Sequence, residues 1–257
     1  IPANTLFLRK NLIFVPECHS TSSLALDLCQ QSCPPEGTLV ITHDQTAGRG
    51  QRGNTWESAP GMNLTFSLVL KPAFLAVKNQ FLLSIIASLA IQDYVASTCG
   101  IAASIKWPND ILINQFKICG ILMENQLAGE RLNYAVIGIG FNVNQRHFQT
   151  LNATSLAIML DKNYDLQMVL EGILGSPEVQ YLRLREGKIL DLRRDYLSHL
   201  YRINQLSTFR SGDKLFQGKI AGVDEDGKLC VSIEGVEKTF DVKEISLLKI
   251  EKIRSDE

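Results

Sequence analysis

The sequence lacks the signals of several protein classes. Its longest predominantly apolar stretch, residues 81–91, is shorter than the roughly 20 residues that span a bilayer. The first ten residues show no signal-peptide pattern, so we expect a cytoplasmic protein without a membrane segment. The 26 Lys and Arg residues nearly balance the 27 Asp and Glu residues, and this near-neutral charge argues against a general binder of polyanions.

The spacing of the thiols and imidazoles also excludes a metal cluster. The chain has six cysteines but no Cys-x-x-Cys pair, and its four histidines show no ligand spacing. We therefore expect no metal site built from these residues, and we interpret the cysteines as reduced thiols of a cytoplasmic protein. They are Cys18, Cys29, Cys33, Cys99, Cys119 and Cys230.

The 257 residues divide into two parts that differ in their sequence pattern. Up to residue 205, helical and strand-like stretches alternate. Hydrophobic residues make up 45% of the whole chain, which allows a sizeable core. From Leu206 onward, short β-prone runs alternate with glycines, and Asp226-Gly227 is a strong hairpin signal. The sequence predicts an α+β domain over 1–205, followed by a small β-barrel module over 206–257.

Short apolar runs and the turn residues between them predict the individual elements. Strands are expected at 12–15, ended by Pro16, and at 39–42, 63–70, 103–107, 111–113, 118–124 and 132–138. Helices are expected at 20–32, where Ser20 and Thr21 offer hydroxyl caps, at 81–97, at 156–160 and over 166–200. The stretch 81–97 is apolar on nearly all faces, so that helix should be buried. Gly175 and Pro177 predict a break at 172–177.

A glycine-rich loop over 45–56 is the most informative stretch. Gly48, Gly50 and Gly53 form a G-x-G-x-x-G pattern, but the loop leads into another strand and not into the helix that a dinucleotide fold requires. Arg49 and Arg52 are accompanied by no acidic residue between positions 45 and 56. Arginines bind carboxylate and phosphate oxygens in bidentate fashion, so the loop indicates an anion site. A mobile surface loop with incidental charges is the alternative.

Three further stretches place polar groups on strands. Residues 106–110 read Lys-Trp-Pro-Asn-Asp, either a tight turn with a Trp anchor or a set of polar groups at a strand end. Lys117 lies in an apolar strand, and Gly120 leaves room beside it. It is either an edge lysine that reaches solvent or a cation with an anionic partner. Residues 138–144 read Gly-Ile-Gly-Phe-Asn-Val-Asn, where glycines indicate a bulge or a closely approaching ligand.

Together these stretches resemble the catalytic domain of biotin protein ligases. The family order is a Ser-Thr helix cap, then GRGxxGxxW, KWPND, K-x-x-G-I-L-x-E and G-x-G-x-N; here these are Ser20-Thr21 and residues 48–56, 106–110, 117–124 and 138–142. The resemblance implies a mixed β-sheet flanked by helices, of the class II synthetase-like type, with an SH3-like C-terminal domain. Two positions depart from the pattern, because Gln51 and Ser22 stand where many relatives carry arginine and asparagine.

The resemblance also implies an activity. Biotin and ATP, with Mg²⁺, would give biotinyl-5′-adenylate, and a lysine of the biotin carboxyl carrier protein of a carboxylase would then take the biotinyl group. The implied catalytic residues are Arg49, Arg52, Asp110 and Lys117. The implied biotin-binding residues are Ser20, Thr21, Ser22, Gln45, Gly48, Arg49, Gly50, Gln51, Lys117 and Gly120. The implied ATP-binding residues are Arg49, Arg52, Trp56, Lys106, Asn109, Lys117 and Asn142.

Other functions remain as alternatives. A lipoate ligase would share the architecture, but its R-R-x-x-G-G-G loop is missing. A nucleotide-binding protein that ligates nothing is less favoured, and the charge balance argues against a nucleic-acid binder that uses Arg49, Arg52 and Trp56. No helix-turn-helix precedes the domain in this sequence, so we expect neither a DNA partner nor a repressor role. The resemblance allows a homodimer.

Overall fold

A seven-stranded mixed sheet forms the centre of the protein, with strand order β1-β2-β3-β7-β6-β5-β4. The computed structural model describes residues 5–248, except for the side chains of Arg52 and Thr98. Strands β1 and β2 are parallel, and every other neighbouring pair is antiparallel. The strands are β1 (Leu12–Cys18), β2 (Leu39–Gln45), β3 (Leu64–Leu70), β4 (Ala103–Lys106), β5 (Asp110–Ile113), β6 (Phe116–Ala128) and β7 (Arg131–Phe141).

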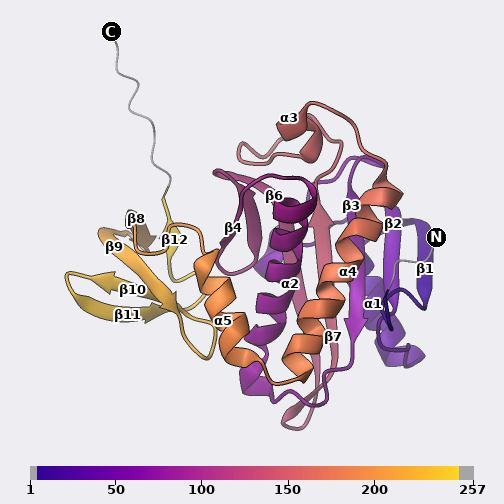
Figure 1. Ribbon diagram of the computed structural model, residues 1–257, viewed down its shortest axis with the longest axis horizontal. Helices are drawn as coiled ribbons and strands as arrows, with labels where there is room; N and C mark the ends of the chain where they lie inside the picture. Colours follow the sequence, from indigo (N-terminus) through magenta and orange to yellow (C-terminus); the bar gives the residue numbers. More distant parts are fainter. Residues whose placement is uncertain (1–4, 249–257) are drawn as a thin grey trace.

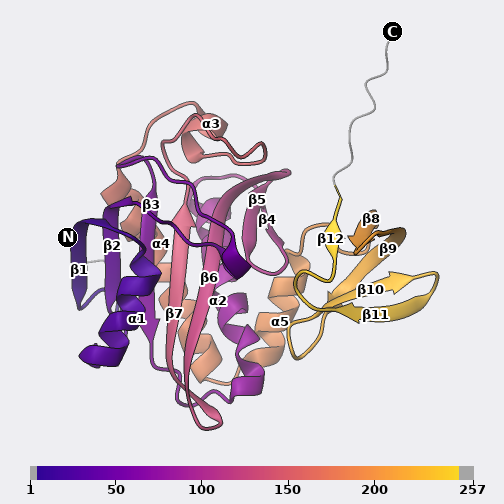
Figure 2. The same cartoon turned by 180° about the vertical axis from the view of Figure 1, so that it is seen from behind.

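Helices cover both faces of this sheet. Helix α1 (Thr21–Gln31) lies on one face, and α2 (Phe81–Asp93), α4 (Leu166–Arg185) and α5 (Ile189–Ser198) lie on the other (Figures 1 and 2). Helix α2 buries most of its residues, as its all-round apolar sequence predicts, and a π-helical turn, Tyr94–Thr98, extends it. The window Val77–Ser97 is long and apolar enough to cross a membrane, but 67% of it is buried inside the protein, as is common for a core helix.

A second, antiparallel sheet follows at the C-terminal end, with order β11-β10-β9-β8-β12 (Figure 1). Its strands are β8 (Leu206–Ser211), β9 (Lys214–Val223), β10 (Leu229–Ile233), β11 (Val236–Phe240) and β12 (Ser246–Leu247). The expected hairpin at Asp226-Gly227 is confirmed, because Gly227 has φ 89° and its N–H donates to the Asp224 carbonyl at 3.2 Å. The mixed sheet, its helices and this small sheet match the predicted fold class.

The two sheets are joined by backbone pairing and not by a free linker. The Tyr201 N–H donates to the Ile105 carbonyl at 2.8 Å, and the Asn204 N–H donates to the Ile220 carbonyl at 2.9 Å. One hydrophobic core contains residues of both sheets, including Phe209 and Val231. Strand β8 begins at Leu206, the first residue of the predicted C-terminal module; the division into two domains stays a prediction.

Two local expectations were wrong. Pro16 does not end the first strand, because β1 is an edge strand and needs no ladder hydrogen bond on its free side. Helix α4 runs through Gly175 and Pro177 without a break, and the chain turns only at Gly187, where φ is 75°. Pro177 is buried, so tertiary packing outweighs its low helix propensity.

None of the six cysteines forms a disulfide, in agreement with the sequence-based expectation. Burial raises the pKa of Cys29 to about 11 and also raises the pKa of Cys119, which lies inside β6. A thiol with a raised pKa stays neutral and unreactive. We assign both side chains to the core.

Helix α5 holds the β9–β10 turn through one arginine. Arg193 donates to the Asp224 carbonyl at 3.0 Å and to the Glu225 carbonyl at 3.1 Å. We expect Arg193→Gln to lower the free energy of unfolding by about 1–2 kcal/mol, because charged donors to these carbonyls are lost. Chemical denaturation measures this loss. The matched control is Arg194→Gln, whose side chain is 72% exposed, and an equal loss in both variants would contradict the assignment.

Candidate functional site

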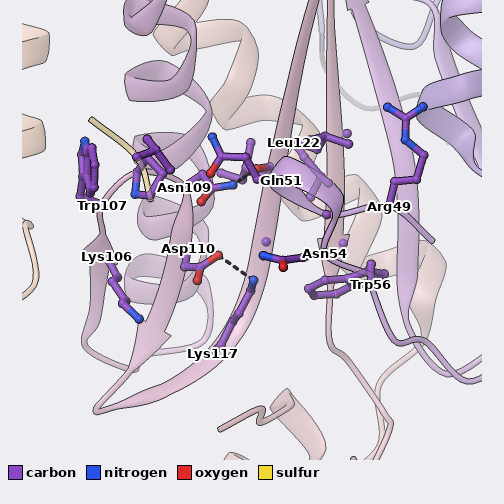
Figure 3. A pocket seen from close by; sticks show the side chains of 18 of the residues that line it. Arg49, Gln51, Asn54, Trp56, Lys106, Trp107, Asn109, Asp110, Lys117 and Leu122 are labelled. Carbon is purple, nitrogen blue, oxygen red and sulfur yellow. Dashed lines mark hydrogen bonds and ion pairs between the residues drawn. The ribbon is translucent and has the colours of Figure 1, made fainter. Parts of the chain in front are cut away.

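A cavity of about 290 Å³ is lined by residues of the main sheet, of the start of α1 and of the C-terminal part of the chain. Figure 3 shows some of the side chains that line it. Most of the predicted site residues line it, although they come from four separate segments of the chain. These residues are Ser20, Thr21, Ser22, Gln45, Arg49, Gly50, Gln51, Trp56, Lys106, Asn109, Asp110, Lys117 and Gly120. The motifs therefore converge on one place.

One end of the cavity is a buried cluster of hydroxyls and one amide. Helix α1 begins there, with Ser20 as its cap as expected, and the Thr21 N–H donates to Gln45 Oε1 at 2.9 Å. Ser67 on β3 donates to Thr21 Oγ1 at 2.9 Å and lies 3.1 Å from Ser22 Oγ. This end can hydrogen-bond the polar edge of a small ring in apolar surroundings. The sequence analysis missed Ser67, because only strand pairing brings it here.

Two paired glycines form the floor beneath Trp56. Gly120 on β6 and Gly140 on β7 are direct partners in the sheet register. A Cβ on Gly120 would lie 2.9 Å from the Trp56 ring, and one on Gly140 would overlap the indole itself. The sequence indicated a bulge or a closely approaching ligand at residues 138–144. In the structure, the Trp56 side chain makes the close approach to Gly140. The Trp56 Nε1 is buried and has no hydrogen-bond partner among the described residues.

Lys117 points into the cavity and forms an ion pair with Asp110, with 2.6 Å between Nζ and Oδ1 (Figure 3). About a third of the lysine side chain is exposed, and its ammonium lies 5.4 Å from the centroid of the Trp56 ring. Lys106 stands opposite Asp110 in the β4–β5 register. The expectation of a lysine with an anionic partner is met within the chain, and Lys117 is not on an edge strand, because β6 lies between β5 and β7.

Arg49 is turned away from the Asp110–Lys117 pair (Figure 3). Its guanidinium donates to Ser23 Oγ at 2.9 Å and forms an ion pair with Glu124. The loop itself offers this arginine no acidic partner, but Glu124 on β6 supplies one. The loop itself is closed, because the Gly50 N–H donates to the Asn54 carbonyl at 2.7 Å and the Trp56 N–H to the Gly48 carbonyl at 2.9 Å. The side chain of Arg52 lies outside the described residues.

Two predicted site residues do not line the cavity. Gly48 lies at the base of the loop, where a Cβ would come within 2.8 Å of Gln45 Nε2, so the absence of a side chain lets the loop close. Asn142 is buried, and its amide donates to the Thr154 carbonyl at 2.9 Å. The structure therefore gives Asn142 a contact with the following segment in place of a contact in the cavity.

Glu57 joins the glycine-rich loop to the segment 149–154. Its carboxylate accepts the N–H of Gln149 at 3.0 Å and the N–H of Thr150 at 3.3 Å. The same segment then pairs with the backbone of Lys117, whose N–H donates to the Asn152 carbonyl at 2.6 Å. No local sequence pattern predicts this contact, because the two segments are about ninety residues apart in the chain.

The C-terminal sheet closes one side of the cavity. Its contribution is mainly apolar and consists of Ile220, Leu229, Val242, Lys243, Ile245, Ser246 and Leu247. The Trp107 indole N–H donates to the Gly227 carbonyl at 2.8 Å, so the expected Trp anchor of the 106–110 turn reaches this sheet. The small sheet is thus part of the cavity wall.

The sequence profile of the biotin/lipoate A/B protein ligase family matches residues 15–142. The bifunctional ligase/repressor BirA of Bacillus spizizenii is 33% identical over 90% of this chain and 72% of its own length. The biotin–[acetyl-CoA-carboxylase] ligase of Mycobacterium tuberculosis is 26% identical over 88% of this chain and 85% of its own length. The structure of the Aquifex aeolicus biotin protein ligase in complex with biotin and ATP has a TM-score of 0.77, with 28% identity over 93% of this chain and 99% of that one.

The glycine floor generates a prediction about Trp56. In Gly140→Ala, the new methyl group cannot coexist with the indole, so Trp56 should move and its fluorescence spectrum should shift. The affinity for a ligand bound in the cavity should fall as well, because Trp56 lines the cavity. The matched control is Gly175→Ala in helix α4, where a Cβ meets nothing within 4 Å. An unchanged spectrum in Gly140→Ala would show that the ring does not depend on this floor.

Proposed function

The chain belongs to the biotin/lipoate A/B protein ligase family and is a biotin ligase, and we propose that it joins biotin to a lysine of a biotin carboxyl carrier protein through biotinyl-5′-adenylate. The observation that carries this proposal is the lining of the cavity. It combines buried hydroxyls and the Gln45 amide with the cations Lys106 and Lys117 and with the Trp56 ring. Such a cavity suits a small polar ring with a carboxylate tail.

The first half-reaction would join the biotin carboxylate to the nucleotide. A carboxylate oxygen attacks the α-phosphorus, the bond to the β-phosphate oxygen breaks, and pyrophosphate leaves with the electron pair. Two anions approach each other in this step, so a fixed cation lowers the barrier. Lys117 can supply that cation from β6. Arg49 can supply a second one after exchanging Glu124 for the ligand, since both groups are anionic partners.

The second half-reaction would transfer the biotinyl group to the carrier. The uncharged lysine amine attacks the acyl carbon, the bond to the phosphate oxygen breaks, and AMP leaves while the amine loses a proton. Asp110 is the residue that we propose to hold or accept this proton. Its ion pair with Lys117 holds the carboxylate at the cavity.

The nucleotide is expected to arrive with Mg²⁺, which neutralises triphosphate charge when bound. Magnesium is commonly held by one or two carboxylates together with substrate phosphates. Asp110 is the one carboxylate among the described residues that line the cavity. The lining of the cavity therefore fits a Mg²⁺ ion that would be held mainly by phosphate oxygens. Asp110, Asn54 and Asn109 line the same cavity and carry further oxygen ligands.

Exchange of labelled pyrophosphate into ATP tests the first half-reaction. We expect exchange that depends on biotin and not on lipoate, followed by transfer of label from biotin to a carrier protein. Exchange driven by lipoate would establish the alternative ligase of the same architecture. Nucleotide binding with no exchange under either acid would reject ligation.

Lys117→Met tests the proposed charge contribution, because methionine keeps the stem and removes the ammonium. We expect kcat for biotin-dependent exchange to fall by roughly 10²-fold or more, as for other lost electrostatic donors. Biotin affinity should fall less, since Thr21 and Gln45 still bind the ring. The Lys117–Asp110 pair is partly exposed, so the free energy of unfolding should change by no more than about 1 kcal/mol.

The matched control for this substitution is Lys214→Met, at an exposed position at the start of β9. It should leave exchange unchanged. A folded Lys117→Met variant with near-normal exchange would make Lys117 a bystander. A large loss of stability would identify the ion pair as structural.

A further inference from the structure

A second, smaller hollow of about 130 Å³ adjoins the main cavity. We call it the annex. The two hollows share Lys106, Asp110, Lys117, Tyr201 and Leu247, so they meet along the Asp110–Lys117 pair. The annex alone is lined by Leu112, Gln115, Thr150, Asn152, Arg202 and Leu248. None of these residues belongs to the predicted site.

The annex contains more positive than negative charge. Lys106, Lys117 and Arg202 line it, and Asp110 is its one acidic side chain. Asp110 is already paired with Lys117, and neither Lys106 nor Arg202 forms an ion pair within the described part of the chain. Two cations thus face a small hollow without an internal counter-ion. Such an arrangement favours an anion with several charges.

Arg202 is held in place by the backbone around it. It has φ 59°, in a region that few non-glycine residues adopt. Leu200 on one side bridges to Ile105 of the main sheet, and Ile203 on the other side bridges to Ile220 of the C-terminal sheet. The guanidinium carbon also lies 5.3 Å from the centroid of the Tyr201 ring. The arginine is therefore presented from a fixed corner where the two sheets meet.

The remaining lining suits phosphate oxygens. Gln115 and Asn152 carry amide donors. The Thr150 hydroxyl already donates to Glu57 Oε2 at 3.4 Å. Glu57 also fixes the backbone at Thr150, and the Lys117 N–H donates to the Asn152 carbonyl, so Asn152 stands on an anchored segment. The volume is less than half that of the main cavity and is small for a nucleoside.

We propose that the annex is a pyrophosphate site, in which Arg202 and Lys106 bind the β- and γ-phosphoryl groups of the nucleotide and then the released pyrophosphate. The proposal rests on the proposed function, because that reaction breaks the bond between the α- and β-phosphates. Lys117 lines both hollows, so an α-phosphate beside it in the main cavity has its leaving group directed into the annex. Arg202 and Lys106 stabilise the negative charge that the leaving group gains.

Titration calorimetry with inorganic pyrophosphate tests this site on the full chain. We expect Arg202→Gln to weaken pyrophosphate binding about tenfold or more, because a charged hydrogen-bond donor is lost. Arg202→Lys should restore part of the affinity. The matched control is Arg194→Gln, which removes the same charge from the exposed side of α5 and should bind like the wild type. Biotin affinity should be unchanged in all variants.

Several results would overturn the proposal. One is a folded Arg202→Gln protein that binds pyrophosphate like the wild type, and another is sulfate binding as tightly as pyrophosphate. A third is a variant that loses only transfer from preformed biotinyl-adenylate to a carrier, which would make the annex a lysine entrance. If the wild type shows no biotin-dependent exchange but its pyrophosphate affinity still depends on Arg202, the proposed function fails and the annex stands.

Discussion

The contact between the Trp56 indole and the Gly120–Gly140 pair is the constraint on which the site depends. It requires two strands to carry glycine at directly opposed positions, so that a large aromatic ring can lie against the sheet. The Lys117 ammonium lies 5.4 Å from the centroid of this ring, within reach of its π face. A side chain on either glycine would displace the ring from the sheet.

The cations of the site are balanced by acids of the chain in the structure described. Lys117 has Asp110, and Arg49 has Glu124. The cations are more exposed than the acids, since the Glu124 and Asp110 side chains are each 23% exposed. A phosphate or carboxylate ligand that takes over Arg49 would leave Glu124 without its cation, so the exchange requires water or another cation to reach Glu124. Lys106 and Arg202 differ, since neither has an acidic partner within residues 5–248.

Much of the architecture could be predicted from the sequence, because apolar runs bounded by turn residues identify strands and an all-round apolar stretch identifies helix α2. Local rules failed where position in the fold decides the outcome. Pro16 is tolerated because its strand is at an edge, and Pro177 because its helix is packed. The loop motifs converge as predicted, but Ser67, Glu57 and the C-terminal wall enter through pairings that no local pattern encodes. Asn142 follows β7 and donates to the Thr154 carbonyl, a contact that no local pattern encodes, and its ATP-binding role stays a prediction.

The segment that connects the two sheets, residues 199–204, makes the cavity depend on the C-terminal part of the chain. Residues 199–204 pair with β4 on one side and with β9 on the other, and Trp107 reaches the β9–β10 turn from the same corner. The cavity wall, Arg202 and the 106–110 turn therefore depend on one set of backbone contacts. Because the small sheet provides the apolar wall, displacing it would open the cavity to water, and a mixed anhydride formed there would be exposed to hydrolysis. The C-terminal sheet is therefore the part of the cavity wall that would keep water away from such an intermediate.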